Sequence, residues 1–140
     1  MKWKIFFALI LLMVFLGSVS AAQTTVGDYK FNIPDGYEQD HSMDVENKKT
    51  SINSVDCHAD SKTFTKQFQQ ISIAVTSPDN GKLPDYLKSY YGGGHDSQLK
   101  GMDGYISLDG HDYLYSYVHD GDWIVIRSND LYGIEDIIVA

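Results

Sequence analysis

Cysteine beside histidine is the first arrangement in this sequence that could carry out nucleophilic chemistry, and it occurs once, at Cys57-His58. A reactive thiolate needs a base within hydrogen-bond reach. Adjacent residues of a β-strand point to opposite faces, so these two side chains can act together only on a turn. We therefore do not expect catalysis at this pair. Because Cys57 is the only cysteine, the chain can form no internal disulfide, and a buried, inert thiol is the simplest interpretation.

The dipeptide His-Asp occurs three times, at residues 95–96, 111–112 and 119–120. Histidine with carboxylate ligands suits zinc or a later transition metal, whereas carboxylates alone suit calcium. Both residue types are also ordinary at turns and strand ends, where we expect these pairs to lie. No EF-hand loop and no structural-zinc spacing is present, so we expect no cofactor and no metal requirement for folding. The alternative is a divalent-cation site at the hairpin ends, with the candidate ligands His111, Asp112, His119, Asp120 and Asp122.

Aromatic residues alternate along one stretch near the C-terminus, from Tyr113 to Tyr117. On a strand, alternate residues share one face, and Trp123 lies opposite Tyr117 in the register that we predict. Two interpretations are open. The rings pack as core under a helix or the N-terminal strands, or they stay uncovered as a platform for sugars, polymer chains or a protein partner. In the second case the binding residues are Tyr113, Tyr115, Tyr117 and Trp123.

The elements that would carry these residues form a predicted β-meander, because Asp-Gly pairs interrupt alternating sequence at residues 103–104, 109–110 and 120–121. We predict three-residue loops that end in a left-handed glycine. The expected strands lie near residues 104–107, 111–118 and 122–128. This register separates the aromatic face from an aliphatic one, which is made of Ile106, Leu114, Val118, Ile124 and Ile126.

Two helices are also predicted. The first covers Leu83–Tyr91, because a proline lies near its first turn and three glycines follow its end. The second covers Leu131–Ala140, with Asn129 or Asp130 as its N-cap. Its apolar stripe should cover one face of the meander, most simply the aliphatic one.

The N-terminal half is expected to contribute fewer strands. Residues 29–33 and 68–76 alternate between apolar and polar and are predicted strands. Residues 39–66 are polar, and we expect there only one or two short edge strands and a mobile loop. The predicted fold class is α+β, an antiparallel sheet of about six strands with a short mid-chain helix and a C-terminal helix packed on it.

Several of these segments together resemble known proteins. They are the opening YKFNIPDGY at residues 29–37, the LPDYL that begins the mid-chain helix after a strong strand, and the closing meander with its helix. In this outline the chain resembles the PsbP-like α/β sandwich domains and small secreted proteins of unknown function from methanogenic archaea. The PsbP-like resemblance implies a sandwich fold and at most a binding or assembly role. The archaeal resemblance implies no catalytic residues.

The N-terminal segment has the three zones of a secretory signal, namely Lys2 and Lys4, an apolar run from Ile5 to Leu16, and small residues up to Ala22. We predict a signal peptide at residues 1–22 and a single domain at residues 23–140. A retained N-terminal membrane anchor is the alternative. Processing would leave 9 basic and 19 acidic residues, a net charge of −10. This acidic balance argues against nucleic acid and anionic lipid as partners.

The predicted signal peptide and the acidic composition together predict a non-enzymatic extracytoplasmic binding or accessory domain of the cell envelope. Its partner would be an envelope protein or a surface polymer, and the membrane would be involved only through an uncleaved signal anchor. The alternative function is a metal-dependent enzyme or divalent-cation-binding protein that uses the histidines and aspartates at the hairpin ends. A third class is a purely structural surface component.

Overall fold

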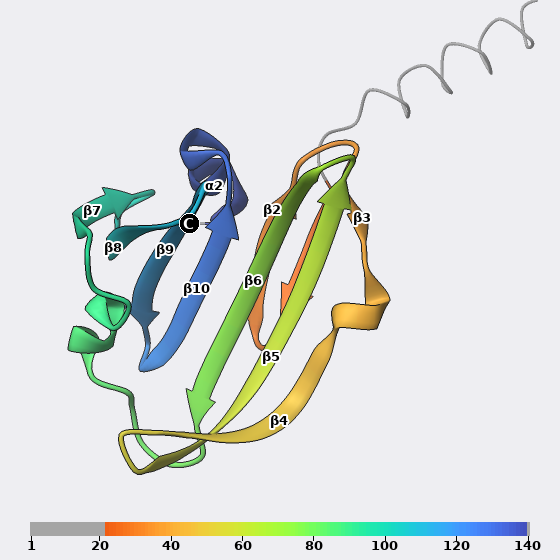
Figure 1. Cartoon of the computed structure of the whole chain (residues 1–140). Coiled ribbons are helices and arrows are strands. Elements are labelled where there is room, and N and C mark those ends of the chain that lie inside the picture. Colours follow the sequence, from red (N-terminus) through yellow and green to blue (C-terminus); the bar gives the residue numbers. More distant parts are fainter. Residues whose placement is uncertain (1–21, 140) are drawn as a thin grey trace, which may run out of the picture.

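Antiparallel β-structure dominates residues 22–139, the part of the chain that the computed structural model describes (Figure 1). The predicted signal peptide and the alternative anchor lie outside these residues except for Ala22. Within residues 22–139, no helix is long and apolar enough to span a bilayer. The strands are β1 (Ala22–Val26), β2 (Tyr29–Ile33), β3 (Glu38–Gln39), β4 (Val45–Ile52), β5 (Val55–Lys66), β6 (Gln69–Pro78), β7 (His95–Leu99), β8 (Met102–Asp109), β9 (Asp112–His119) and β10 (Asp122–Ser128). The helices are two 3₁₀-helices, η1 (His41–Met43) and η2 (Asp85–Ser89), and one α-helix, α2 (Leu131–Ile137).

Eight of the strands form one sheet, and β1 and β2 form a separate hairpin. The order in the sheet is β3-β5-β6-β10-β9-β8-β7, and β4 also pairs with β5. The predictions of an antiparallel sheet and of a C-terminal helix packed on it are confirmed. So are the strands predicted at residues 29–33 and 68–76, which correspond to β2 and β6. The fold is nevertheless mostly β, because the sheet has more strands than the six expected and the mid-chain helix is a short 3₁₀-helix.

The prediction for residues 39–66 was wrong, because this segment contains the eight-residue strand β4 and the twelve-residue strand β5. Strand β5 pairs with β6 over ten residues, from Cys57 to Lys66. One of its faces carries small or hydroxyl side chains instead of large apolar ones. Thr63, for example, is buried and its hydroxyl lies 3.2 Å from that of Ser72. A search for apolar alternation does not detect such a strand, since its buried residues are only Cys57, Thr63 and Phe64, one of them polar, and they do not alternate regularly.

The predicted register of the meander was also wrong by an odd number of residues at each turn, three at the first turn and one at the second. Asp109 pairs with Asp112 and His119 pairs with Asp122, so both loops have two residues rather than three. In the second loop, Asp120 and Gly121 both have positive φ values, 50° and 80°, as a type I′ turn requires. A shift of one residue moves every side chain of a strand to the other face. Each face of the meander therefore carries both aromatic and aliphatic side chains.

The main core lies between the sheet and a layer made of β1, β2 and α2 (Figure 1). The Asp130 carboxylate caps α2 by accepting a hydrogen bond from the backbone N–H of Tyr132 at 3.1 Å, which confirms one of the two predicted caps. The helix ends at Ile137, three residues before the predicted end. Its apolar stripe packs into the main core as expected. The core residues are Val26, Phe31, Ile33, Phe64, Ile71, Ile73, Val75, Ile106, Tyr115, Tyr117, Ile124, Ile126, Ile134, Ile137 and Ile138.

Tyr115 is the largest fully buried side chain of this core. Its hydroxyl donates a hydrogen bond to the carbonyl of Met102 at 2.5 Å and accepts one from the N–H of Leu99 at 3.3 Å. The ring lies against Gly104 on the neighbouring strand. A Cβ atom on Gly104 would lie 2.5 Å from Cε2 and from the hydroxyl oxygen of Tyr115, so only glycine leaves room for the ring.

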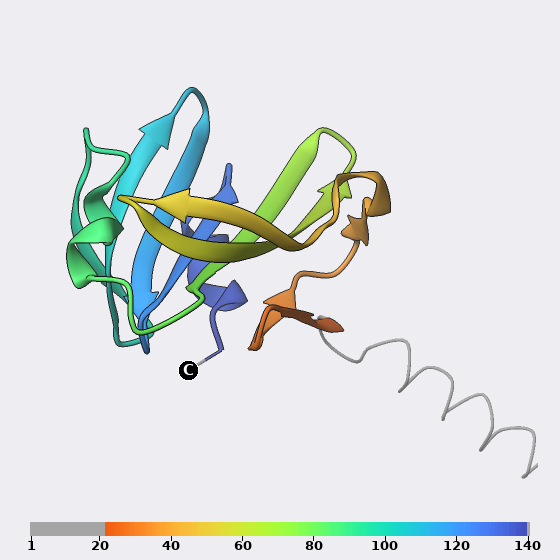
Figure 2. The same cartoon turned by 90° about the horizontal axis from the view of Figure 1, so that it is seen from below.

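A second, smaller core lies on the opposite face of the sheet. Its buried members are Cys57, Leu83, Leu87 and Trp123. Leu83 and Leu87 belong to the segment that contains η2, and they attach this segment to the sheet. Figure 2 shows β4 running across this face toward η2. The sheet is therefore covered on both faces at this end.

Burial in the second core has a chemical consequence for Cys57. The thiol is 1% exposed, and burial raises its pKa, with smaller contributions in the same direction from Asp79 and Asp56. Only the thiolate reacts with electrophiles. We therefore expect maleimide to label native Cys57 more than about tenfold more slowly than the urea-unfolded chain, as measured by mass spectrometry. Equal rates in the two states would contradict the buried position.

Candidate functional site

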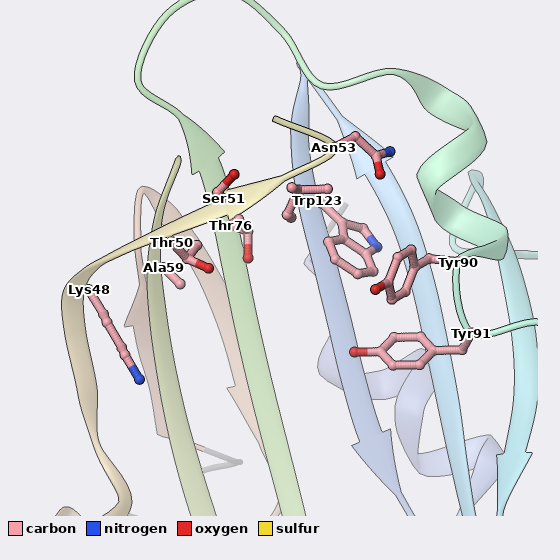
Figure 3. A pocket seen from close by; sticks show the side chains of 10 residues that line it. Lys48, Thr50, Ser51, Asn53, Ala59, Thr76, Tyr90, Tyr91 and Trp123 are labelled. Carbon is pink, nitrogen blue, oxygen red and sulfur yellow. The ribbon is translucent and has the colours of Figure 1, made fainter. Parts of the chain in front are cut away.

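A cleft of about 450 Å³ opens on the face of the sheet that carries the second core (Figure 3). Ala59 of β5 and Thr76 of β6, which pair with each other, lie between its two walls. One wall is polar and consists of β4 and the turn that follows it. The other is aromatic. The polar wall comprises Lys48, Thr50, Ser51, Ile52 and Asn53, and the aromatic wall comprises Tyr90, Tyr91 and Trp123.

The three rings of the aromatic wall touch one another. The ring centroid of Trp123 lies 5.3 Å from that of Tyr90 and 5.8 Å from that of Tyr91, and the two tyrosines are 5.6 Å apart. These are the separations of directly packed aromatic pairs. Trp123 is 7% exposed, whereas Tyr90 is 61% and Tyr91 50% exposed. The rings thus form a continuous wall with its tyrosines open to solvent and no gap between its members.

Two hydrogen bonds hold the parts of the aromatic wall in place. The indole N–H of Trp123 donates a hydrogen bond to the hydroxyl of buried Ser116 at 2.6 Å, which fixes the ring. The two tyrosines follow η2 directly. Their segment is attached to the sheet by the N–H of Leu83, which donates to the carbonyl of Gly121 at 2.9 Å. The wall therefore depends on how residues 82 and 83 pack on the β9–β10 turn.

The polar wall is joined to the aromatic one at the end of the cleft. Asn53 and Ser54 form the β4–β5 turn, and both have left-handed φ values, 49° and 68°. This two-residue turn directs the amide of Asn53 toward η2, where its Nδ2 lies 3.4 Å from the hydroxyl of Tyr86. Thr50 directs its hydroxyl into the cleft, and Lys48 and Ile52 share its face of β4, whereas the neighbouring Ser51 points to the other face (Figure 3).

The electrostatic character of the cleft is simple. Lys48 is the single residue of the lining that is charged at neutral pH, and the lining contains no carboxylate. Among residues 22–139, Lys48 takes part in none of the ion pairs that the structure forms. Burial raises the pKa of Tyr91 and Tyr90 adds to the rise, although Arg127 opposes it. The Tyr91 hydroxyl therefore remains a neutral donor and acceptor.

The structure places the predicted aromatic site residues on two different faces. Tyr115 and Tyr117 are buried in the main core, and burial raises the pKa of both. Tyr113 is partly buried and packs against the same core. Trp123 points to the opposite face because of the shifted register. The first of the two interpretations, core, therefore holds for the tyrosines, and Trp123 alone of the four lines the cleft.

The predicted metal ligands are also not brought together. Asp112 lies at the start of β9 and His119 at its end, seven residues or roughly 23 Å apart. The carboxylate of Asp112 accepts a hydrogen bond from Arg127 at 2.8 Å, and that of Asp122 accepts one from the hydroxyl of Tyr29 at 2.6 Å. His111, which is exposed, lies next to Asp112 at the start of β9. Asp120 lies at the other end of this strand, where its carboxylate is 3.4 Å from Nε2 of His119. Within residues 22–139, no group of three histidine, cysteine or acidic side chains is arranged to hold a metal ion.

Most of the cleft was missed by the reasoning from sequence. Tyr90 and Tyr91 were assigned to the end of a helix, and the polar wall to a mobile loop. One signal was available, since two consecutive tyrosines before three glycines place large rings at a point where the chain turns away. Comparison with family models, with curated proteins and with solved structures finds no match to this chain.

Proposed function

We propose that this chain is a non-enzymatic extracytoplasmic binding domain of the cell envelope, and that its ligand binds in the cleft between the polar and the aromatic wall. The aromatic wall carries this proposal. Two tyrosines that are at least half exposed lie against an ordered tryptophan and face hydroxyl and amide groups. Ligand sites combine aromatic or apolar surface with a few polar groups in this way, in cavities of about 300–1,000 Å³.

Binding fits the lining better than catalysis does. The ten residues around the cleft include no carboxylate, imidazole or thiol. General acid–base catalysis depends mainly on such groups, with a pKa near the working pH. The thiol of Cys57 is buried, and among the hairpin-end aspartates Asp112 is hydrogen-bonded to Arg127 and Asp122 to Tyr29. The secretory pattern of residues 1–22 supports the location outside the cytoplasm.

The proposal is tested by localising binding with two-dimensional NMR spectra of the protein. Four classes of soluble probe are added separately: neutral oligosaccharides, acidic oligosaccharides, proline-rich peptides and quaternary ammonium compounds. We expect one class to shift the signals of Tyr90, Tyr91 and the Trp123 indole, because these groups form the open wall of the cleft. The probe recovered after long incubation should be chemically unchanged.

Two alanine variants separate binding from folding. Tyr91→Ala should abolish or strongly reduce the shifts while thermal stability stays close to that of the wild type, because the ring is half exposed. Tyr132→Ala is the matched control, since Tyr132 is 84% exposed on α2 and does not line the cleft. The proposal fails if no probe class perturbs the cleft, or if a probe is converted to product.

A further inference from the structure

We infer that the ligand of the cleft is a neutral saccharide, bound with one sugar ring against the aromatic wall and its hydroxyl groups toward the polar wall. This inference rests on the proposed function and specifies the chemical class of its ligand. It is argued from the charge of the lining, the arrangement of the rings and the kind of polar groups opposite them.

Charge disfavours ionic ligands of either sign. A cation would find no carboxylate in the lining, and it would find no aromatic cage. A cage has to hold its rings apart around a void, whereas these three rings are 5.3–5.8 Å apart and in contact. A polyanion would meet a single ammonium group, that of Lys48, on a chain of net charge −8. A neutral ligand remains.

The aromatic wall suits a ligand that has one apolar face. Tyr91, which is half exposed, supplies an open ring surface, and the buried ring of Trp123 packs against it at an angle of 34° and helps to hold it in place. A sugar ring has such a face, formed by its axial C–H groups, with its hydroxyl groups around the edge. Contact of this face with rigid aromatic rings buries apolar area at little entropic cost.

The polar wall suits the edge of a sugar ring. A sugar hydroxyl both donates and accepts hydrogen bonds, and so do the hydroxyl of Thr50, the amide of Asn53 and, from the aromatic wall, the hydroxyl of Tyr91. Figure 3 shows the Tyr91 hydroxyl directed away from η2, toward the strands across the cleft. These groups can complete reciprocal hydrogen bonds with a ligand between the walls.

A proline-rich peptide is the main competing ligand. Its backbone carbonyls only accept hydrogen bonds, so its recognition relies on fixed donors such as an indole N–H. In this cleft the N–H of Trp123 is already used by Ser116 at 2.6 Å. The remaining groups are mostly hydroxyls, which match a partner that donates as well as accepts. The arrangement therefore favours a saccharide over a peptide.

The test uses the fluorescence of Trp123. The sequence contains two tryptophans, so Trp3→Phe in the full chain leaves Trp123 as the single reporter, and it lies in the cleft. The probes are neutral linear hexasaccharides of glucose, mannose, galactose or N-acetylglucosamine, each titrated separately. Hexagalacturonate, a proline hexapeptide and choline represent the competing classes. We expect a saturable change with at least one neutral hexasaccharide and none with the competing probes.

Variants of the wall make the test specific. Tyr91→Ala should weaken binding of the hexasaccharide by about tenfold, because it removes an exposed ring of the aromatic wall. Tyr91→Phe keeps the ring and removes only the hydroxyl, so it should weaken binding less than Tyr91→Ala does. Thr50→Val, which replaces a hydroxyl by a methyl group at equal volume, should weaken binding severalfold. Tyr132→Ala should leave it unchanged.

Each other outcome overturns the inference in a recognisable way. If the proline peptide, hexagalacturonate or choline binds with loss on Tyr91→Ala while the neutral sugars do not, the ligand class is wrong and the proposed function stands. If no probe changes the fluorescence, both are wrong. If a hexasaccharide binds but Tyr91→Ala leaves its affinity unchanged, the sugar binds elsewhere, and the assignment to this cleft is wrong.

Discussion

Replacing Tyr115 by alanine is expected to lower the free energy of unfolding by about 3–5 kcal/mol. The ring is fully buried in the main core, where its removal would leave a cavity that the surrounding strands cannot fill. The substitution also removes the hydroxyl that pairs with the Met102 carbonyl and the Leu99 N–H. Urea denaturation followed by circular dichroism measures the loss. A change of less than about 1 kcal/mol would contradict the core position of the ring.

Two further variants separate the contribution of the Tyr115 hydroxyl to this stability from that of the packing of its ring against Gly104. Tyr115→Phe retains the ring and removes only the hydroxyl, so it should cost about 1 kcal/mol. Gly104→Ala should destabilise strongly, because its new methyl group would overlap the Tyr115 ring. In the Tyr115→Ala background the same change should cost far less, since the space is then empty. Such non-additivity is the signature of two groups in direct contact.

Replacing Gly121 by valine is expected to cost about 2–4 kcal/mol, through two effects that add. The φ of 80° is strained for any residue with a side chain, and most of all for a β-branched one. A Cβ atom at this position would also lie 2.5 Å from the Cβ and 2.8 Å from the Cα of Lys82. The backbone of residues 82 and 83 would have to move, and with it the aromatic wall.

Gly110→Val is the matched control for this prediction. Gly110 also has a positive φ, 64°, in a two-residue hairpin loop, but a Cβ there would meet no atom within 4 Å. It should therefore show the backbone strain alone, about 1–2 kcal/mol. The two losses of unfolding free energy are measured by thermal or urea unfolding. Their difference gives the contribution to stability from the packing of the η2 segment on the turn. Equal losses would mean that this packing contributes nothing.

The sequence allowed β2, β6, the three meander strands and the final helix to be predicted, but neither the long strands β4 and β5 nor the faces on which the meander side chains lie. The dipeptide Asp-Gly occurs at residues 109–110 and 120–121, but it occupies different positions in the two turns. In the first, the aspartate ends a strand and the glycine begins the loop, whereas in the second both residues form the loop. Sorting the side chains by hydropathy then favoured the wrong register. A tyrosine can occupy a core position once its hydroxyl has partners, as Tyr115 does with Met102 and Leu99.

Of the residues that line the cleft, Trp123 was the one predicted from the sequence as a binding residue. The second wall of the cleft comes from β4, whose side chains are polar and mostly exposed and give no periodic signal. The position of β4 depends on its pairing with β5, which shifts register between Val45 and Lys48, and on the turn at Asn53 and Ser54, which brings residues far apart in the sequence next to η2. Long-range geometry of this kind is not encoded in a local pattern.

The two cores differ in their number of buried residues, and this difference affects which part of the molecule unfolds locally. Fifteen buried residues hold the main core, but only four hold the second. Local unfolding costs least where few apolar contacts must separate, so the η2 segment should open while the sheet remains paired. Amide hydrogens of Leu83 and Leu87 would then exchange with solvent faster than those of β9 and β10. A bound ligand that touches Tyr90, Tyr91 and β4 together would slow this exchange, so protection of these two amides would report occupancy of the cleft.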